Sequence, residues 1–160
     1  MSTTKIASEI FKIDSPIRDV YALLSDFGRV GRLATMARQM GMAQGMQMEQ
    51  IAGKVQDVRF TEEACHIVFQ GMGELIITIV EKEEPKLIKL EGVGTMPMEF
   101  NLWFQFLENA PYDTRMKITF QGELNVVLKM LLKGKLEKAI NQLGEGLSKI
   151  PYSLLSNSGF

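Results

Sequence analysis

Residues 13–27 read Ile13-Asp-Ser-Pro-Ile-Arg-Asp-Val-Tyr-Ala-Leu-Leu-Ser-Asp-Phe27, and this stretch decides the fold. Ser15 is suited to cap a helix because its hydroxyl can accept an orphan backbone N–H, and Pro16 fits the first helical position because it has no N–H to lose. Asp19 adds a negative charge near the helix N-terminus. The stretch therefore predicts the end of a strand, a turn and a short helix, whose apolar residues recur at helical spacing at Ile17, Val20, Tyr21, Leu23 and Leu24.

The residues on either side of this stretch extend the pattern. Upstream, the segment Lys5 to Asp14 is rich in β-branched and aromatic residues, which predicts a first strand. Downstream, a second short helix is predicted by the spacing of Val30, Leu33, Ala34 and Ala37. Two short helices are thus expected in tandem after the first strand.

The middle of the chain, residues 55–121, predicts an antiparallel meander. Strand-like segments alternate there with short turn signals, and helical periodicity is weak. The connections are too short for the crossovers that parallel neighbours need. The expected strands are Val55 to Phe60, Ala64 to Gln70, Glu74 to Lys82, Lys86 to Val93, Phe100 to Leu107 and Tyr112 to Gln121.

Alternation of apolar and polar residues is clearest in the last of these strands. There, one face is expected to pack and the other to meet water, with Tyr112, Thr114, Met116, Ile118 and Phe120 on the packed side. In the preceding strand both faces are partly apolar: Phe100, Leu102, Phe104 and Phe106 share one, while Asn101, Trp103, Gln105 and Leu107 share the other. The sequence leaves open which face of that strand lines the concave side.

A long amphipathic helix is expected from Leu124 to Ile150. Its apolar residues recur at three- and four-residue steps and form a broad stripe. Gly134 is a candidate break between a short helix and a long one, and Pro151 is a natural stop. We expect one domain over residues 1–152 and a polar tail over residues 153–160.

Residues 13–27 also resemble the opening signature of the START-like superfamily, also called SRPBCC, which runs I-D-x-P-x-x-x-V-(W/Y)-x-x-(L/I)-(S/T)-D. Tyr21 stands where Trp or Phe is common, and the segment Lys86-Leu-Ile-Lys-Leu-Glu91 after Glu84-Pro85 resembles the fourth hairpin of the family. The resemblance runs from about Lys5 to Tyr152. It implies an α+β helix-grip fold, with a seven-stranded curved antiparallel sheet around a long C-terminal helix and two short helices after strand one. Members include lipid and sterol carriers, hormone and allergen-type ligand binders, polyketide cyclases and chaperone-activator domains, which share a cavity between sheet and helix.

Composition excludes several other classes of function. The formal net charge is −1, from 18 Lys and Arg against 19 Asp and Glu, so no global field favours nucleic acid. The single cysteine, Cys65, cannot form an intramolecular disulfide, and the chain starts without an export signal, so we expect a cytoplasmic protein. No apolar run reaches the ~20 residues of a membrane span, so we expect no integral membrane association. One His and one Cys cannot complete a zinc shell, and nucleotide-binding glycine motifs are absent, so we expect no metal and no cofactor.

The leading expectation is binding or transport of a hydrophobic small molecule, such as a lipid, sterol, quinone or polyketide-like compound, between the sheet and the C-terminal helix. Plain core packing is the competing interpretation for every candidate lining residue. The methionine-rich segment 36–48 is either a loose connector, an adaptable apolar lid or a partner-binding surface. The candidate ligand-binding residues are Met36, Met40, His66, Phe69, Trp103, Met116, Leu136, Ile140 and Leu143.

Two alternatives stay open beside ligand binding, as does the oligomeric state. A cyclase, dehydratase or hydrolase would need a titratable group in the pocket; His66 is the only histidine, and its neighbour Cys65 must point to the opposite face of a strand. Other conceivable polar participants are Glu74, Glu99 and Arg115. A protein-interaction module of the chaperone-activator kind could use the lysine-rich helix face of Lys129, Lys133, Lys135 and Lys138.

Overall fold

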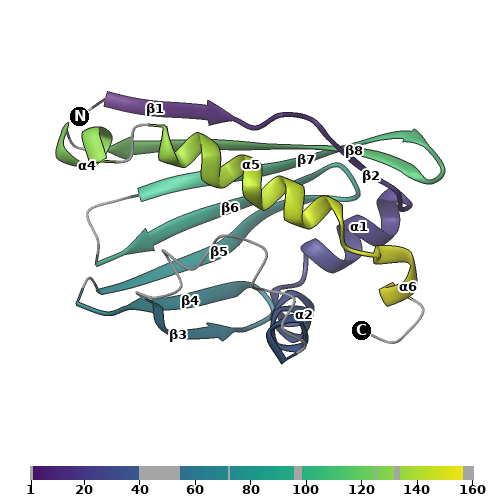
Figure 1. The fold of residues 1–160 in the computed structure, drawn as a ribbon, viewed down its shortest axis with the longest axis horizontal. Coiled ribbons are helices and arrows are strands. Elements are labelled where there is room, and N and C mark those ends of the chain that lie inside the picture. The colour runs from purple at the N-terminus through teal and green to yellow at the C-terminus, as the bar shows by residue number, and fades with distance from the viewer. Residues whose placement is uncertain are drawn as a thin grey trace.

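The computed structural model describes residues 2–39, 55–71, 73–95, 99–124, 126–131 and 134–156. Its strands are β1 (Ser2–Ala7), β2 (Phe11–Ile13), β3 (Val55–Phe60), β4 (Ala64–Phe69), β5 (Gly73–Glu83), β6 (Leu87–Gly94), β7 (Glu99–Ala110) and β8 (Asp113–Leu124). They form one antiparallel sheet in the order β1-β8-β7-β6-β5-β4-β3, and β2 also pairs with β8 (Figure 1). The predicted meander is confirmed, because each strand from β3 to β7 pairs with the strand that follows it in the chain.

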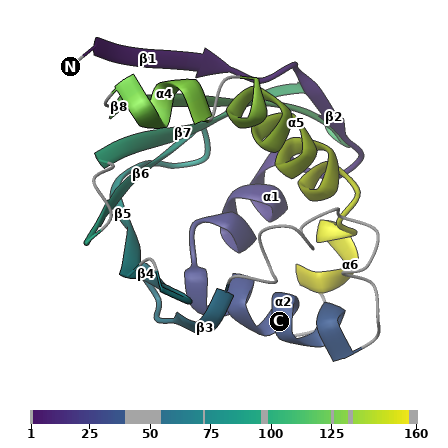
Figure 2. The same ribbon diagram turned by 60° about the vertical axis from the view of Figure 1, so that its left-hand side comes forward.

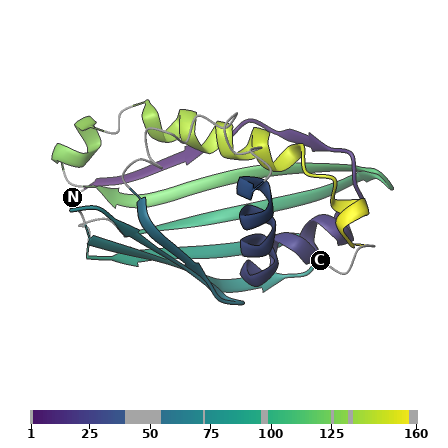
Figure 3. The ribbon, with the colours of Figure 1, turned by 60° about the horizontal axis from the view of Figure 1, so that its bottom comes forward.

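The helices lie on the concave side of this sheet. They are α1 (Ile17–Leu24), α2 (Phe27–Gln39), α4 (Val126–Leu131), α5 (Lys135–Ser148) and α6 (Tyr152–Ser156). The sheet curves around α1 and α5 (Figure 2), and α2 crosses the sheet near β3 (Figure 3). The predicted α+β helix-grip architecture is therefore confirmed. Across the described parts of the chain, each helix is too short or too polar to cross a bilayer.

The predicted first strand is divided by a one-residue bulge. Opposite β8, Ala7 pairs with Thr119 and Phe11 with Met116, so three residues of one strand face two of the other. Ser8 satisfies both backbone groups of Ile118 at the bulge: its N–H donates to the Ile118 carbonyl at 2.8 Å, and its Oγ accepts the Ile118 N–H at 2.9 Å. The extra residue reverses the alternation, so that Ile6, opposite Phe120, and Phe11, opposite Met116, lie on the same side of the sheet.

The bulge also holds α5 in place. The Glu9 N–H donates to Asn141 Oδ1 at 2.8 Å, which joins the bulge to the middle of the helix. Three residues further along α5, the backbone of Gly144 lies against the Phe11 ring, and a Cβ added there would come within 2.2 Å of Phe11 Cε2. Only glycine allows the helix to approach this closely, because any larger side chain would push the helix or the ring away.

Helix α1 forms where residues 13–27 predict it, with one difference at its start. Pro16 is the N-cap, in an extended conformation, and no side chain caps the helix there, so the expected Ser15 cap is wrong. The Ser15 carbonyl instead accepts a hydrogen bond from Thr114 Oγ1 at 2.7 Å, which fixes the turn onto β8. Asp26 caps the following helix, since its Oδ1 accepts the N–H of Gly28 at 2.9 Å.

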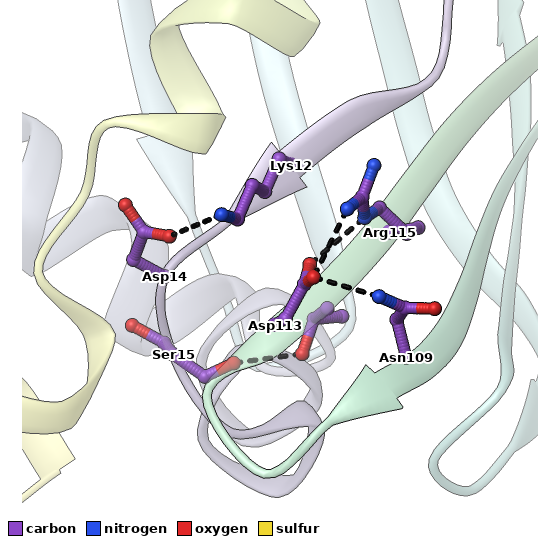
Figure 4. A network of polar contacts seen from close by, with 7 residues as sticks. Lys12, Asp14, Ser15, Asn109, Asp113 and Arg115 are labelled. Atoms are coloured by element: carbon purple, nitrogen blue, oxygen red, sulfur yellow. Dashed lines mark hydrogen bonds and ion pairs between the residues drawn. The ribbon is translucent and has the colours of Figure 1, made fainter.

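A polar network on β8 borders this turn (Figure 4). Asp113 accepts two hydrogen bonds from the Arg115 guanidinium, at 2.8 and 3.0 Å, and one from Asn109 Nδ2 at 2.8 Å. Hydrogen bonds from Arg115, and then from Asn109, lower the pKa of Asp113 to about 2. The carboxylate therefore stays ionised throughout the ordinary pH range. Nearby, Lys12 forms an exposed ion pair with Asp14 at 3.7 Å.

The C-terminal helical region is broken where the sequence predicts, at Gly134, whose φ is 78°. The segments on either side are α4 and α5, and α5 ends at Ser148, before Pro151. At the end of the described chain, residues 152–156 form α6, and Tyr152 is buried. Tyr152 Oη donates to the Leu147 carbonyl at 2.7 Å, and burial raises the pKa of this phenol.

Candidate ligand-binding site

The concave side of the sheet from β4 to β8 is lined mainly by apolar side chains. The polar residues on this side are the buried Thr114 and, near the strand ends, the exposed Lys82 and Glu108. Directly opposed residues share a face, so the pairing register assigns each side chain. In β7, the register places the Phe100, Leu102, Phe104 and Phe106 face on this side, which resolves the alternative left open by the sequence. The apolar positions on this side are Cys65, Ile67 and Phe69 of β4, Leu75, Ile77 and Ile79 of β5, Ile88, Leu90 and Gly92 of β6, those four residues of β7, and Met116, Ile118, Phe120, Gly122 and Leu124 of β8.

This face is closely packed in one region and open in another. Met116 and Ile118 are 0% exposed, and Phe106 makes an edge-to-face contact with Tyr21 of α1 at 6.5 Å between ring centroids. Elsewhere, several apolar side chains on the same side remain only partly covered, and five of them are grouped under one name. We call Phe69, Ile77 and Leu102 of the sheet and Leu136 and Leu143 of α5 the open apolar set.

A groove of about 540 Å³ lies between α2 and β3. Its β3 residues, Val58 and Phe60, pair with Ile67 and Cys65, so the groove opens on the same side of the sheet as the open apolar set. Helix α2 approaches β3 closely because Gly31 leaves room for the Phe60 ring; a Cβ at Gly31 would come within 2.6 Å of it. The described lining residues are Gly28, Gly31, Arg32, Thr35, Met36, Val58 and Phe60.

The structure places the predicted ligand-binding residues in four surroundings. Met36 lines the groove between α2 and β3. Phe69, Leu136 and Leu143 belong to the open apolar set, whereas Met116 and Ile140 are buried in the core. His66 and Trp103 lie on the outer face of the sheet, and Met40 lies outside the described residues, as does nearly all of the segment 36–48.

The two outer-face residues have polar surroundings. Trp103 sits opposite Thr119 and Lys89, and the Lys89 ammonium lies 5.3 Å from the centroid of the indole ring. His66 Nδ1 lies 3.2 Å from Glu74 Oε1, and this carboxylate also lies 3.9 Å from the Arg59 guanidinium. Both arrangements are contacts of a solvent-facing sheet surface, so we leave these two residues out of the proposed site.

The concave face offers little for acid–base or nucleophilic chemistry. From Cys65 to Leu124, the buried and partly buried strand positions that the structure describes on this face hold no carboxylate and no imidazole; Glu108, opposite Thr114, is exposed at the end of β7. Cys65 is the exception with a reactive atom, but burial raises the pKa of its thiol to about 11, which keeps it protonated and unreactive. Burial, and then the charge of Glu84, also raise the pKa of Tyr21. Among the described residues, no group of three His, Cys, Asp or Glu side chains could hold a metal ion.

The Cys65 thiol should react slowly with a disulfide reagent in the folded protein. At pH 8, a rise of the pKa from 9.0 to about 11 lowers the thiolate fraction by about two orders of magnitude. A thiolate with a higher pKa is also more nucleophilic, which offsets about one of these orders in the reaction rate. Burial slows access further, so we expect labelling at least about tenfold slower than in urea. Stopped-flow measurement of thiol release checks this, and equal rates in buffer and urea would contradict the buried position.

Sequence reasoning missed Ile77 and Leu102 of the open apolar set. The sequence pattern could have identified both: Leu75, Ile77 and Ile79 occupy alternate positions along β5, and Leu102 belongs to one of the two partly apolar faces of β7. The groove residues Val58 and Phe60 gave no such signal, because only the packing of α2 against β3 brings them beside Met36.

No protein-family model matches the chain, and no curated protein matches it in sequence. Solved structures match it in fold. Norcoclaurine synthase from Thalictrum flavum, solved in complex with dopamine and hydroxybenzaldehyde, superposes with a TM-score of 0.63 at 9% identity, over 92% of this chain and 86% of the other. A conserved protein from Geobacillus kaustophilus gives 0.60 at 12% identity, over 92% and 93%. A protein from Thermobifida fusca, solved by NMR, gives 0.57 at 16% identity, over 97% and 95%.

These likenesses show the fold of the chain. The order of the strands, the paired helices after the first strand and the C-terminal helix on the concave side together make a helix-grip fold, which these solved structures share. The resemblance of residues 13–27 to the opening signature of the START-like (SRPBCC) superfamily is thereby confirmed at the level of the fold.

Proposed function

We propose that the protein binds an apolar small molecule between the concave face of the sheet and α5. The observation that carries the proposal is the open apolar set, in which five large side chains face the interior but are only partly covered. Leaving such a surface exposed to water is unfavourable by roughly 25 cal/mol for each Å². A ligand that covers it recovers this free energy.

The groove between α2 and β3 supports the same proposal. Its volume of about 540 Å³ falls within the usual range for small-molecule sites, about 300–1,000 Å³. Met36 and Phe60 supply apolar contact there, and Arg32 and Thr35 supply the few polar groups that commonly orient a ligand. The groove opens on the same side of the sheet as the open apolar set, which supports binding on this side.

The chemistry of the site favours binding over catalysis. A cyclase or hydrolase needs a positioned acid or base, and the only such group at the covered strand positions that the structure describes on this face is the protonated Cys65 thiol. The complex of norcoclaurine synthase with dopamine and hydroxybenzaldehyde supports the view that this fold accommodates small aromatic molecules. A lipid, sterol, quinone or polyketide-like compound fits the apolar lining of this chain.

A pair of tryptophan reporters tests the proposal. Trp103, the only tryptophan, lies on the outer face, while its neighbour Leu102 lies on the inner one. Oleic acid, cholesterol, a short-chain ubiquinone and anthraquinone are titrated into the wild type and into the double variant Leu102→Trp/Trp103→Phe. We expect at least one compound to give a saturable emission change in the double variant, and a change less than a third as large in the wild type.

Matched substitutions on one strand complete the test. Ile77→Gln places an amide on the concave face, and we expect at least a tenfold weaker affinity for the compound that binds. Thr78→Gln, one residue along on the outer face, should leave affinity unchanged. Equal emission changes in the double variant and the wild type would refute the proposed site. So would the absence of any emission change, if native mass spectrometry and extraction of the purified protein also find no apolar compound.

A further inference from the structure

Helix α4 carries two of the most exposed large apolar side chains of the described chain. Val126 and Met130 are each 74% exposed, and they are four positions apart in one short helix, so they project from one side of it. Other exposed apolar residues are more scattered, as at Leu154 of α6. A pair of this kind needs an explanation that core packing does not give.

Lysines accompany this pair. Lys129 lies between the two apolar residues, and Lys135 and Lys138 stand in the first turn of α5; all three are exposed. Across residues 126–138 the sequence holds four lysines and one acidic residue, Glu137, in a chain whose overall net charge is −1. We call Val126, Lys129, Met130, Lys135 and Lys138 the α4 surface.

The α4 surface lies at one end of the molecule, beside the N-terminus and away from α6 and the C-terminus (Figure 1). The pairing register places the end of β8 beside the start of β7, and the start of β5 beside the end of β6. The turn that follows Phe69 is at this same end, because Phe69 pairs with Gly73. The α4 surface is thus at the end of the sheet where part of the open apolar set lies.

We propose that the α4 surface docks the protein peripherally on a bilayer rich in anionic phospholipids. Exposed apolar side chains flanked by lysines match the chemistry of such an interface, where apolar groups enter the headgroup region and lysines meet lipid phosphates. Two apolar side chains are too few for the core of a stable protein–protein interface, which buries more than about 1,000 Å². Insertion into lipid has no such minimum area.

Docking in this way brings the end of the sheet that holds Phe69 toward the membrane. A hydrophobic molecule could then pass between the bilayer and the concave face over a short path. The membrane contact itself does not depend on ligand binding, so the two proposals are tested separately.

Vesicle co-sedimentation of the purified full-length chain tests the contact. Vesicles of phosphatidylcholine alone are compared with vesicles containing 30 mol% phosphatidylserine, at low and at high NaCl. We expect at least tenfold stronger partitioning onto the anionic vesicles at low salt, lost at high salt. The variant Lys135→Gln/Lys138→Gln should weaken this partitioning by about twenty-fivefold, since each lysine near an anionic surface contributes roughly fivefold.

Apolar variants separate a membrane from other partners. Val126→Gln/Met130→Gln should weaken partitioning by at least fivefold at unchanged melting temperature, whereas Leu154→Gln, a substitution at a 72% exposed site in α6, should have no effect. Three results would overturn the proposal: no preference of the wild type for anionic vesicles, an equal loss with Leu154→Gln, or full binding by Val126→Gln/Met130→Gln. The last result would indicate a purely electrostatic surface, as an acidic protein partner would use.

Discussion

Met116→Ala should lower the free energy of unfolding by about 2–5 kcal/mol, the range for removing a fully buried large side chain and leaving a cavity. Met116 is 0% exposed and lies between β2 and β7, opposite Phe11 on one side and Phe106 on the other. Because no solvent reaches it, its side chain serves the core and does not line a ligand site. Urea denaturation followed by circular dichroism measures the change.

A neighbouring residue supplies the control. Leu107 of β7 pairs with Arg115, next to Met116, but is 67% exposed on the outer face. Leu107→Ala should change stability by no more than about 0.5 kcal/mol. If Met116→Ala costs less than about 1 kcal/mol and instead alters ligand affinity, Met116 belongs to the site and the boundary drawn between core and open apolar set is wrong.

Tyr152→Ala should be destabilising by about 3–5 kcal/mol, as for other large buried aromatic residues. The ring is buried, and α6, which it begins, contacts α1. Its hydroxyl donates to the Leu147 carbonyl. Thermal or urea denaturation of the variant checks whether residues 152–156 belong to the folded domain.

Two further variants separate the contribution of the Tyr152 hydroxyl from that of its ring. Tyr152→Phe removes only the hydrogen bond and leaves the Leu147 carbonyl without that donor, so we expect a loss of about 1–2 kcal/mol. Leu154→Ala, at an exposed position of the same helix, should be nearly neutral. A nearly neutral Tyr152→Ala would mean that α6 adds little to the stability of the domain.

The strands and their pairing could be predicted from the sequence because short turns leave few topologies. Between β3 and β8, each connection forces a hairpin, and alternation in β8 gave the packed side of that strand. The first strand was harder. Its apolar residues read as a single segment, but Ile6 and Phe11 are an odd number of positions apart, and only a bulge lets both face the core.

The candidate site was less accessible to sequence reasoning. Trp103 was a candidate ligand-binding residue, although the sequence left open which face of its strand is concave. The outer face accommodates its ring, which lies beneath the Lys89 ammonium. His66 was also a candidate ligand-binding residue. Its partner Glu74 is eight residues away in the next strand, and the pairing register places both side chains on the outer face. Long-range packing, not local pattern, sets these positions.

The bulge at Ser8 makes the spacing of this segment matter more than most of its chemistry. Glu9 uses only its backbone N–H toward Asn141, and Ile10 is 67% exposed, so many residue types can occupy both positions. Removing one residue is different in kind, because it would turn either Ile6 or the pair Phe11 and Ile13 toward solvent. Across relatives of this chain, positions 9 and 10 should therefore vary freely in composition while the length of the connection between β1 and β2 stays constant, and an alignment that opens a gap there should be distrusted.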